Sequence, residues 1–216
     1  MHRARRLPFE ELAPYLLPVP EEPRPFSWGA VLGNDHPVEI EVGFGKGLFL
    51  LTSAQTQPHV NFLGIEIERK YQLFAATRMA KRGLSNVRLV KADARSFLRA
   101  FVAAGSCQAV HVYFPDPWWK TRHRKRRVFT PEFAAQCERV LQTGGHLHFA
   151  TDVEEYFSVM IELVAEQTRL RRLPLDQPSG IEQGAEARTN FERKARLLGK
   201  VIYRACYERP AERAIG

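Results

Sequence analysis

The chain has 216 residues, enough for one well-packed domain and few for two, and its 44% hydrophobic and 26% charged residues exclude wholesale disorder. Its first apolar stretch is broken by Pro14 and Pro18, and no later run reaches the roughly 20 apolar residues of a membrane helix, which argues against a signal peptide or a membrane span. Three widely spaced cysteines without a CxxC pair argue against a disulfide framework and a structural zinc site. We therefore expect a cytoplasmic protein without a metal.

Basic charge is concentrated in one part of the chain. The net charge is +8, and it would fall to +2 without six basic residues that lie between Asp116 and Glu132 with no acid among them. These six residues, called here the basic run, are Lys120, Arg122, Arg124, Lys125, Arg126 and Arg127. Such a run favours a polyanionic partner, because each cation placed on a phosphate releases a condensed counterion. A solvated loop that charge keeps soluble would give the same pattern.

In chain order, the sequence begins with a proline-rich N-terminal extension, residues 1–37, which we expect to pack on a single domain formed by residues 38–216. From Val38 onwards, short β-rich runs alternate with longer segments whose apolar residues recur at helical spacing. The predicted strands are 38–42, 61–65, 87–90, 109–114, 146–150 and 200–208, and the predicted helices are 47–55, 69–82, 95–104, 131–141 and 154–167. Residues 173–186 are predicted to form a loop. This alternation predicts an α/β fold in which helices cover both faces of a parallel sheet.

A glycine-rich turn directly follows the first predicted strand, in the sequence Glu41-Val42-Gly43-Phe44-Gly45-Lys46-Gly47. Glycine tolerates positive φ and lets a ligand approach the backbone, and the helix that follows offers free N–H groups to an anion. Glu66 follows the second predicted strand, where an acid can accept hydrogen bonds from ribose hydroxyls. Asp93 follows the third strand and could meet the rim of an adenine. Because three strand ends agree, the pattern favours a nucleoside cofactor over a tight turn with surface acids.

Two cofactor classes compete for this arrangement of a glycine turn and acids. A dinucleotide site favours G-x-G-x-x-G, but Leu48 stands at the sixth position here. The pattern E-x-G-x-G-x-G, with further acids after the second and third strands, resembles that of class I methyltransferases. Glu41, before the turn, also suits a ligand with an ammonium group better than one with a pyrophosphate.

The fourth predicted strand runs into Phe114-Pro115-Asp116-Pro117-Trp118-Trp119-Lys120 and then into the basic run. The two prolines fix the chain on either side of Asp116, so its carboxylate is held on a stiff turn at the sheet edge. Trp118 or Trp119 offers a face on which a base could stack, although we expect at least one of them to lie in the core. An aspartate at this position beside a polycation favours a reaction centre that faces a nucleic acid.

The stretch FPDPWWKTRHRKRR resembles the signature of the bacterial tRNA (guanine-N7-)-methyltransferases. Three further motifs match that family, namely EVGFGKG, Thr151-Asp152 and Thr189-Asn190-Phe191-Glu192, and the resemblance extends from about Val38 to Arg209. It implies a Rossmann-like class I methyltransferase fold, with a mostly parallel central sheet, helices on both faces and an antiparallel last strand. It also implies that S-adenosylmethionine is the cofactor and that a guanine in the tRNA variable loop is the substrate.

The same resemblance assigns roles to individual residues, with Asp116 as the implied catalytic residue. The implied cofactor-binding residues are Glu41, Gly43, Gly45, Glu66, Asp93 and Asp116. The implied tRNA contacts are Lys120, Asp152, Thr189, Asn190, Phe191 and Glu192, and the basic run would grip the RNA through Arg122, Arg124, Lys125, Arg126 and Arg127. Neither a metal nor a membrane is expected, and the oligomeric state is left open between a monomer and a homodimer.

Methyl transfer to N7 of guanine makes specific demands on such a site. N7 carries an in-plane lone pair and no proton, so the reaction requires no general base. Orientation of the methyl group and negative charge near the purine are therefore expected to supply the rate. Asp116, Asp152 and Glu192 are candidates to accept hydrogen bonds from N1–H and N2–H of a guanine extruded from its stack.

The sequence leaves alternative functions open. A nicotinamide dehydrogenase would fit the strand pattern, but the third glycine is missing and the basic run would have no explanation. A methyltransferase that acts on another RNA would keep the glycine turn, the acids and the basic run. A non-catalytic RNA-binding protein would keep the basic run without needing acids at successive strand ends. The histidines His111, His146 and His148 alternate with strand residues, so we expect them to be packed side chains and not metal ligands.

Overall fold

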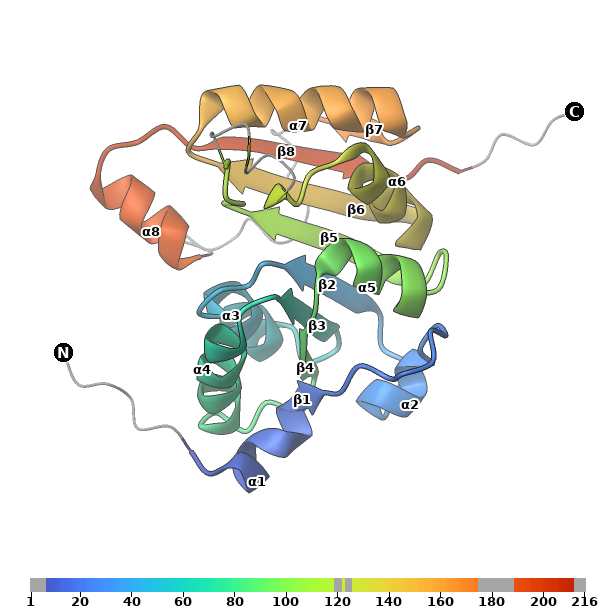
Figure 1. The fold of residues 1–216 in the computed structure, drawn as a ribbon, viewed down its shortest axis with the longest axis vertical. Helices are drawn as coiled ribbons and strands as arrows, with labels where there is room; N and C mark the ends of the chain where they lie inside the picture. The colour runs from blue at the N-terminus through green and yellow to red at the C-terminus, as the bar shows by residue number, and fades with distance from the viewer. Residues whose placement is uncertain (1–6, 119–121, 123–125, 175–188, 212–216) are drawn as a thin grey trace, which may run out of the picture.

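The computed structural model describes residues 7–118, 122, 126–174 and 189–211 of the chain. Within these residues it forms one sheet of eight strands, in the order β1-β4-β3-β2-β5-β6-β8-β7 (Figure 1). The strands are β1 (Leu16–Leu17), β2 (Val38–Val42), β3 (Asn61–Glu66), β4 (Val87–Lys91), β5 (Cys107–Tyr113), β6 (Leu141–Thr151), β7 (Arg171–Leu173) and β8 (Tyr203–Glu208). Neighbouring strands from β1 to β6 are parallel, whereas β8 runs antiparallel to both β6 and β7. The predicted mostly parallel sheet with an antiparallel last strand is confirmed.

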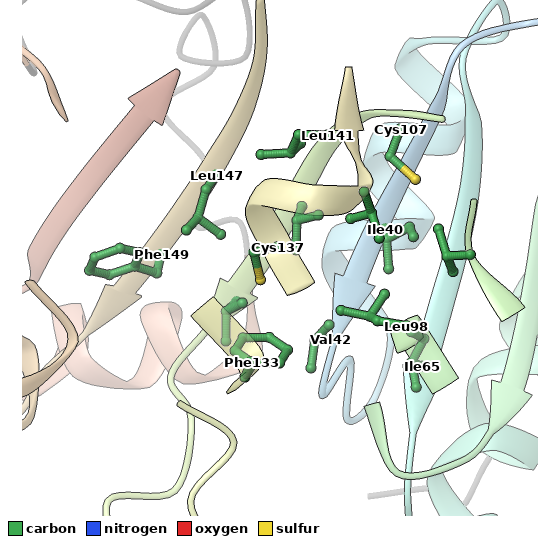
Figure 2. Packing of buried hydrophobic residues seen from close by; sticks show 14 of the residues in the cluster. Ile40, Val42, Ile65, Leu98, Cys107, Phe133, Cys137, Leu141, Leu147 and Phe149 are labelled. Carbon is green, nitrogen blue, oxygen red and sulfur yellow. The ribbon is translucent and has the colours of Figure 1, made fainter. Parts of the chain in front are cut away.

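Helices cover both faces of this sheet. Those after β2 are α3 (Leu48–Thr56), α4 (Arg69–Ala80), α5 (Ala94–Phe101), α6 (Pro131–Val140), α7 (Glu154–Gln167) and α8 (Asn190–Leu197), and the shorter α1 (Phe9–Leu12), η1 (Ala13–Tyr15) and α2 (Trp28–Leu32) precede it. One apolar core joins α2, α5, α6 and α7 to one face, and a second joins α1, α3 and α4 to the other. Figure 2 shows part of the first core, where Ile40 and Val42 of β2 lie near Leu98 of α5 and Phe133 of α6.

The central strands are buried on both faces, which explains why they form continuous apolar runs in the sequence. All five residues of β2 and all six of β3 are buried. Alternate residues enter opposite cores, so Leu63 and Ile65 belong to the first core and Phe62 belongs to the second. Glu39 and Glu41 of β2 are acidic side chains that are nevertheless buried. Buried acids are rare, so each needs a specific explanation.

Most predicted elements are confirmed with small shifts at their ends, and β2 and α7 have the predicted boundaries. Strand β6 differs, because it begins at Leu141 directly after α6 and not at His146. Cys107 of β5 pairs with Leu141, but Ala109 already pairs with His146, so β6 bulges between these two pairs. Gly144, with a φ of 74°, provides the left-handed backbone that this bulge requires.

Helix α8 and strand β7 were not anticipated from the sequence. Thr189 caps α8, because its hydroxyl oxygen accepts the N–H of Glu192 at 3.0 Å. Figure 1 shows α8 beyond the carboxyl end of β5. Strand β7 extends the sheet beside β8 up to Leu173, and residues 175–186 of the predicted loop lie outside the described residues.

The described part of the N-terminal extension contacts the rest of the fold at several points. Strand β1 adds to the sheet as the parallel neighbour of β4. Leu12 is buried in the second core, and the ring of Phe26 stacks on that of Phe101 at a centroid distance of 5.7 Å. The division of the chain at residue 37 stays a prediction.

Candidate active site

Motifs that are far apart in the sequence meet at the carboxyl ends of the parallel strands. The glycine turn (residues 43–47) follows β2, and the Asp116 turn (residues 114–118) follows β5. The ring of Phe191 in α8 stacks on that of Phe114 at a centroid distance of 6.3 Å. Phe191 also lies beside the turn, since a Cβ added at Gly45 would be 3.9 Å from its Cε2. The fold therefore gathers three of the predicted motifs at one edge of the sheet.

Glu41 provides a buried acid beneath the glycine turn. Its side chain is 3% exposed, and its Oε2 has no hydrogen-bond partner among the described residues. Burial and the neighbouring charge of Glu66 raise the pKa of Glu41 to about 8, although the N–H of Leu50 opposes this rise. Gly43 and Gly45 have φ values of 74° and 51°, which favour glycine. A buried carboxylate with a free acceptor can receive a cationic group.

Glu66 is fixed by the backbone around it. Its Oε2 accepts the N–H of Gly45 at 2.9 Å, and its Oε1 accepts those of Ile67 at 2.9 Å and Glu68 at 3.1 Å. The structure thus links the second predicted acid directly to the glycine turn. Ile67, which the sequence analysis did not single out, is 61% exposed and presents an apolar surface next to the acid. In the sequence, Ile67 could have been found from its position directly after the acid that ends β3.

Asp93 has a structural role in the described structure. It caps α5 by accepting the N–H of Ser96 at 3.1 Å, and it pairs with Arg95 at 3.1 Å. Burial raises the pKa of Asp93, but the hydrogen bonds from Arg95 and Ser96 outweigh it, so the pKa lies below its ordinary value. A contact between Asp93 and an adenine stays a prediction.

The Asp116 turn holds an exposed carboxylate on a strained backbone. Phe114 and Trp118 have φ values of 51° and 40°, which are rare for residues with a side chain. The N–H of Phe114 donates to the Ala150 carbonyl at 2.7 Å, which attaches the turn to β6. Asp116 itself is exposed. Strain of this kind is common at functional sites, where the surrounding structure maintains it.

Arg127, the last residue of the basic run, folds back onto the Asp116 turn. Its Nε donates to the Pro117 carbonyl at 2.6 Å. Its guanidinium carbon lies 5.0 Å from the centroid of the Tyr156 ring on α7. The family resemblance implies that Arg127 binds RNA, but these contacts lie within the protein.

The rest of the basic run is described only in part. Arg122 and Arg126 are exposed, and the Arg126 guanidinium lies 5.1 Å from the centroid of the half-buried Trp118 ring. The three remaining predicted contacts, Lys120, Arg124 and Lys125, lie outside the described residues.

Glu192 is the most buried acid on the α8 side of the site. Its side chain is 1% exposed, and its Oε1 accepts hydrogen bonds from Arg196 at 2.5 Å and from Arg204 of β8 at 2.6 Å. The carboxylate that was predicted to bind guanine therefore attaches α8 to β8 in this structure. Neither arginine was singled out from the sequence, because their spacing from Glu192 becomes meaningful only once α8 packs against β8.

Of the other described substrate candidates, Phe191, Asn190 and Asp152 are at least partly exposed, whereas Thr189 is buried. Phe191 is 58% exposed, and Asn190, the first residue of α8, is half-buried. Asp152 pairs with Lys200 at 2.6 Å, and its side chain is 23% exposed. Thr189 is buried and acts as the cap of α8.

A buried polar network lies beneath the glycine turn. His111 Nε2 is 2.9 Å from Glu39 Oε2, and His111 Nδ1 is 3.0 Å from the Tyr113 hydroxyl. The ring of His148 stacks on that of His111 at 5.0 Å. Burial raises the pKa of Glu39, but the hydrogen bond and charge of His111 outweigh it and leave the pKa below its ordinary value. The prediction that these two histidines are packed is confirmed.

Neither a metal cluster nor a membrane-spanning helix is present in the described part of the chain. Within those residues, no group of three or more His, Cys, Asp and Glu side chains could hold a metal ion. No helix in the same ranges is long and apolar enough to cross a membrane. The three cysteines are buried and free, and burial raises the pKa of Cys107 to about 12.

The fold is that of the class I, Rossmann-like methyltransferases. The chain is similar to the solved aminoglycoside resistance methyltransferase NpmB1 with a TM-score of 0.53 and 20% identity, over 80% of this chain and 86% of that chain. It is also similar to a solved antibiotic-related methyltransferase with a TM-score of 0.54 and 18% identity, over 82% and 90% of the two chains. At such identities the likeness shows the fold alone.

Sequence relatives define the family within that fold. The family model described as "Putative methyltransferase" matches residues 35–205. A tRNA (guanine-N(7)-)-methyltransferase of Rhodopirellula baltica is 42% identical over 200 residues, which cover 89% of this chain and 74% of the relative. Another of that name, from Geobacillus kaustophilus, is 35% identical over 202 residues, 93% and 91% of the two chains. The chain belongs to the tRNA (guanine-N7-)-methyltransferase family, as its motifs predicted.

Proposed function

We propose that this chain transfers the methyl group of S-adenosylmethionine to N7 of a guanine in tRNA, and that this guanine lies in the variable loop. The observation that carries the proposal is the meeting of two dissimilar acids at one sheet edge. Glu41 is buried beneath the glycine turn with a free acceptor oxygen, and Asp116 is exposed next to a basic run. The first suits a small cationic cofactor and the second suits a nucleic acid.

The residues around the glycine turn fit S-adenosylmethionine. Glu41 would accept its ammonium group, and the free N–H groups at the start of α3 would donate to its carboxylate. Oε2 of Glu66, which accepts one backbone N–H, keeps acceptor capacity for a ribose hydroxyl, whereas Oε1 already accepts two. The exposed Ile67 would cover one face of the adenine. When bound, the cofactor would supply an electrophilic methyl group on a sulfonium.

The opposite side of the site is suited to an extruded guanine. Asp116 would face the purine and stabilise the positive charge that develops on it when N7 is methylated. Asp116 and Asp152 are the acids that would accept the N1–H and N2–H donors, because Glu192 already binds two arginines. The exposed ring of Phe191, beside the glycine turn, offers a stacking surface for the base.

The basic run would hold the RNA backbone outside this pocket. Arg122 and Arg126 are exposed at the rim of the Asp116 turn, and Lys120, Arg124 and Lys125 belong to the same stretch of sequence. Contacts of this type recognise the shape and charge of RNA and leave the choice of base to the pocket. A tRNA substrate places the proposed activity in the cytoplasm.

Transfer of labelled methyl from S-adenosylmethionine to an unmodified tRNA transcript tests this function. The expected product is N7-methylguanosine at one variable-loop position. A matched transcript with 7-deazaguanosine at that position has the same shape but lacks N7, so it should accept no label. Label in other RNAs only would support the alternative RNA substrate. Binding of tRNA without binding of S-adenosylhomocysteine would support a non-catalytic RNA-binding protein.

A further inference from the structure

The position of Arg127 separates it from the rest of the basic run. Arg122 and Arg126 are exposed, whereas Arg127 is half-buried against the protein. Its Nε donates to the Pro117 carbonyl at 2.6 Å, so the bond is made at the residue that directly follows Asp116. A charged donor makes this hydrogen bond stronger than one between neutral groups.

The Arg127 guanidinium also lies over a buried aromatic ring. Its carbon lies 5.0 Å from the centroid of the Tyr156 ring. Tyr156 is fully buried in the first core, near the start of α7. A cation over an aromatic face is attracted by the quadrupole of the ring, and more strongly where water is excluded. Arg127 therefore connects the turn to the core.

The Asp116 turn needs such a connection. None of the described residues donates a hydrogen bond to the Asp116 carboxylate, and the backbone of the turn carries that exposed side chain. That backbone is strained, with positive φ at Phe114 and at Trp118 on the two sides of the aspartate. The prolines restrict φ within the turn, but they do not fix where the turn lies relative to the sheet.

We infer that Arg127 is a positioning residue, which holds the Asp116 turn against the Tyr156 ring and does not bind RNA phosphate. The inference rests on the proposed function, because it gives Arg127 a role in placing the acid of that reaction. It divides the basic run between neighbouring residues, since Arg126 stays exposed over Trp118 and available to RNA. The electrostatic surroundings agree, because burial raises the pKa of Tyr156 to about 12, and Arg127 lowers and Asp116 raises that pKa.

Matched substitutions at Arg127 and Arg126 test this division. Arg127→Lys keeps the charge but loses the Nε donor and the planar group, so kcat at saturating tRNA should fall roughly 10- to 100-fold. Arg127→Ala should lower kcat at least as much, while the tRNA Kd and its salt dependence change less than twofold. Arg126→Ala should show the reverse pattern, with its main effect on binding: tRNA binding roughly fivefold weaker and the salt slope lower by about 0.7 to 0.9.

Variants of the supporting ring exclude a general loss of folding as the cause. Tyr156→Phe keeps the aromatic face and should keep kcat, whereas Tyr156→Leu should lower it. The loss in the double variant Tyr156→Leu, Arg127→Ala should be smaller than the product of the single losses, because both remove one contact. Unchanged kcat in Arg127→Lys, or a lower salt slope in Arg127→Ala, would overturn this inference alone. A wild-type protein that methylates no tRNA would overturn the proposed function instead.

Discussion

The cofactor side and the RNA side of this site hold their acids in different ways. On the cofactor side, Glu41 and Glu66 are buried, and three backbone N–H groups fix the orientation of Glu66. On the RNA side, Asp116 is exposed on a turn that a side chain supports, and Asp152 pairs with Lys200 at the surface.

The difference follows from the two ligands that we propose. A small cofactor can be enclosed, so its partners can be set by backbone and burial before it arrives. A tRNA cannot be enclosed, and we expect basic side chains at the surface to bind its backbone. We therefore expect substitutions on the two sides to affect different steps.

The largest effect is expected at Asp116. Asp116→Asn keeps the size of the side chain but removes its charge, so kcat should fall roughly 100- to 1000-fold, the usual cost of losing one preorganised electrostatic contact to a transition state. Binding of tRNA and of S-adenosylhomocysteine should change much less, which direct binding measurements would check. Activity within tenfold of the wild type would remove Asp116 from the reaction centre.

The second effect is a pH dependence on the cofactor side. Because the pKa of Glu41 is raised to about 8, the acid is mostly protonated at pH 7 without ligand, and an ammonium group must drive its ionisation. Affinity for S-adenosylhomocysteine should therefore rise with pH, by at most about tenfold per unit, until pH 8. Calorimetry in buffers of different ionisation enthalpy should detect the released proton. Glu41→Gln should bind weakly and without this pH dependence.

The same raised pKa predicts how the stability of the ligand-free protein varies with pH. The unfolded chain releases the Glu41 proton near its ordinary pKa of 4.5, whereas the folded chain keeps it to about 8. The contribution of Glu41 to stability thus falls as pH rises through this window. The Glu41→Gln variant should lack that part of the decline in denaturant unfolding. If the stability of both proteins declined equally as pH rises, ionisable groups other than Glu41 would be the cause.

A third and smaller effect concerns the attachment of α8. Glu192→Gln leaves Arg196 and Arg204 without their buried carboxylate, and we expect a loss of roughly 2 to 3 kcal/mol, below the value for fully buried pairs because both arginines are partly exposed. Asp152→Asn is the matched control, since its pair with Lys200 is exposed and worth about 0 to 1 kcal/mol. If both variants lost the same unfolding free energy, the expected difference between the buried and the exposed ion pairs would be contradicted.

The sequence was sufficient to predict six of the eight described strands, most of the helices and the acids at the strand ends, but neither β1 nor β7. Periodicity predicted β2 and α7 at their observed boundaries, because strong apolar patterns dominate where elements are buried. It missed α8, whose short polar sequence NFERKARL gives little apolar signal and whose stability depends on a cap and on ion pairs with β8. It also missed the start of β6, where a bulge interrupts the pairing.

Individual roles in the site were harder to predict than its location. The motifs placed Glu192 and Arg127 at the site, but they could not show which groups these side chains contact. Glu192 is a substrate candidate through the family motif, and that motif does not reveal its pairing with Arg204 on a different element. Arg127 was grouped with its neighbours in sequence, although its contact with Tyr156 exists only after α7 packs on the sheet. Local sequence does not contain such tertiary pairings.

The central claim is that separate groups of residues bind the cofactor and the RNA. Measuring the affinity of each ligand for each of two variants tests this claim most directly. The variants are Glu41→Gln and the double variant Arg122→Gln, Arg126→Gln, and the ligands are S-adenosylhomocysteine and tRNA. Our account predicts that the first loses at least tenfold in cofactor affinity and keeps its tRNA affinity within twofold. The second should lose roughly 10- to 30-fold in tRNA affinity through two fewer phosphate contacts and bind the cofactor normally. Weaker binding of both ligands by both variants would contradict the claim that separate groups of residues bind the cofactor and the RNA.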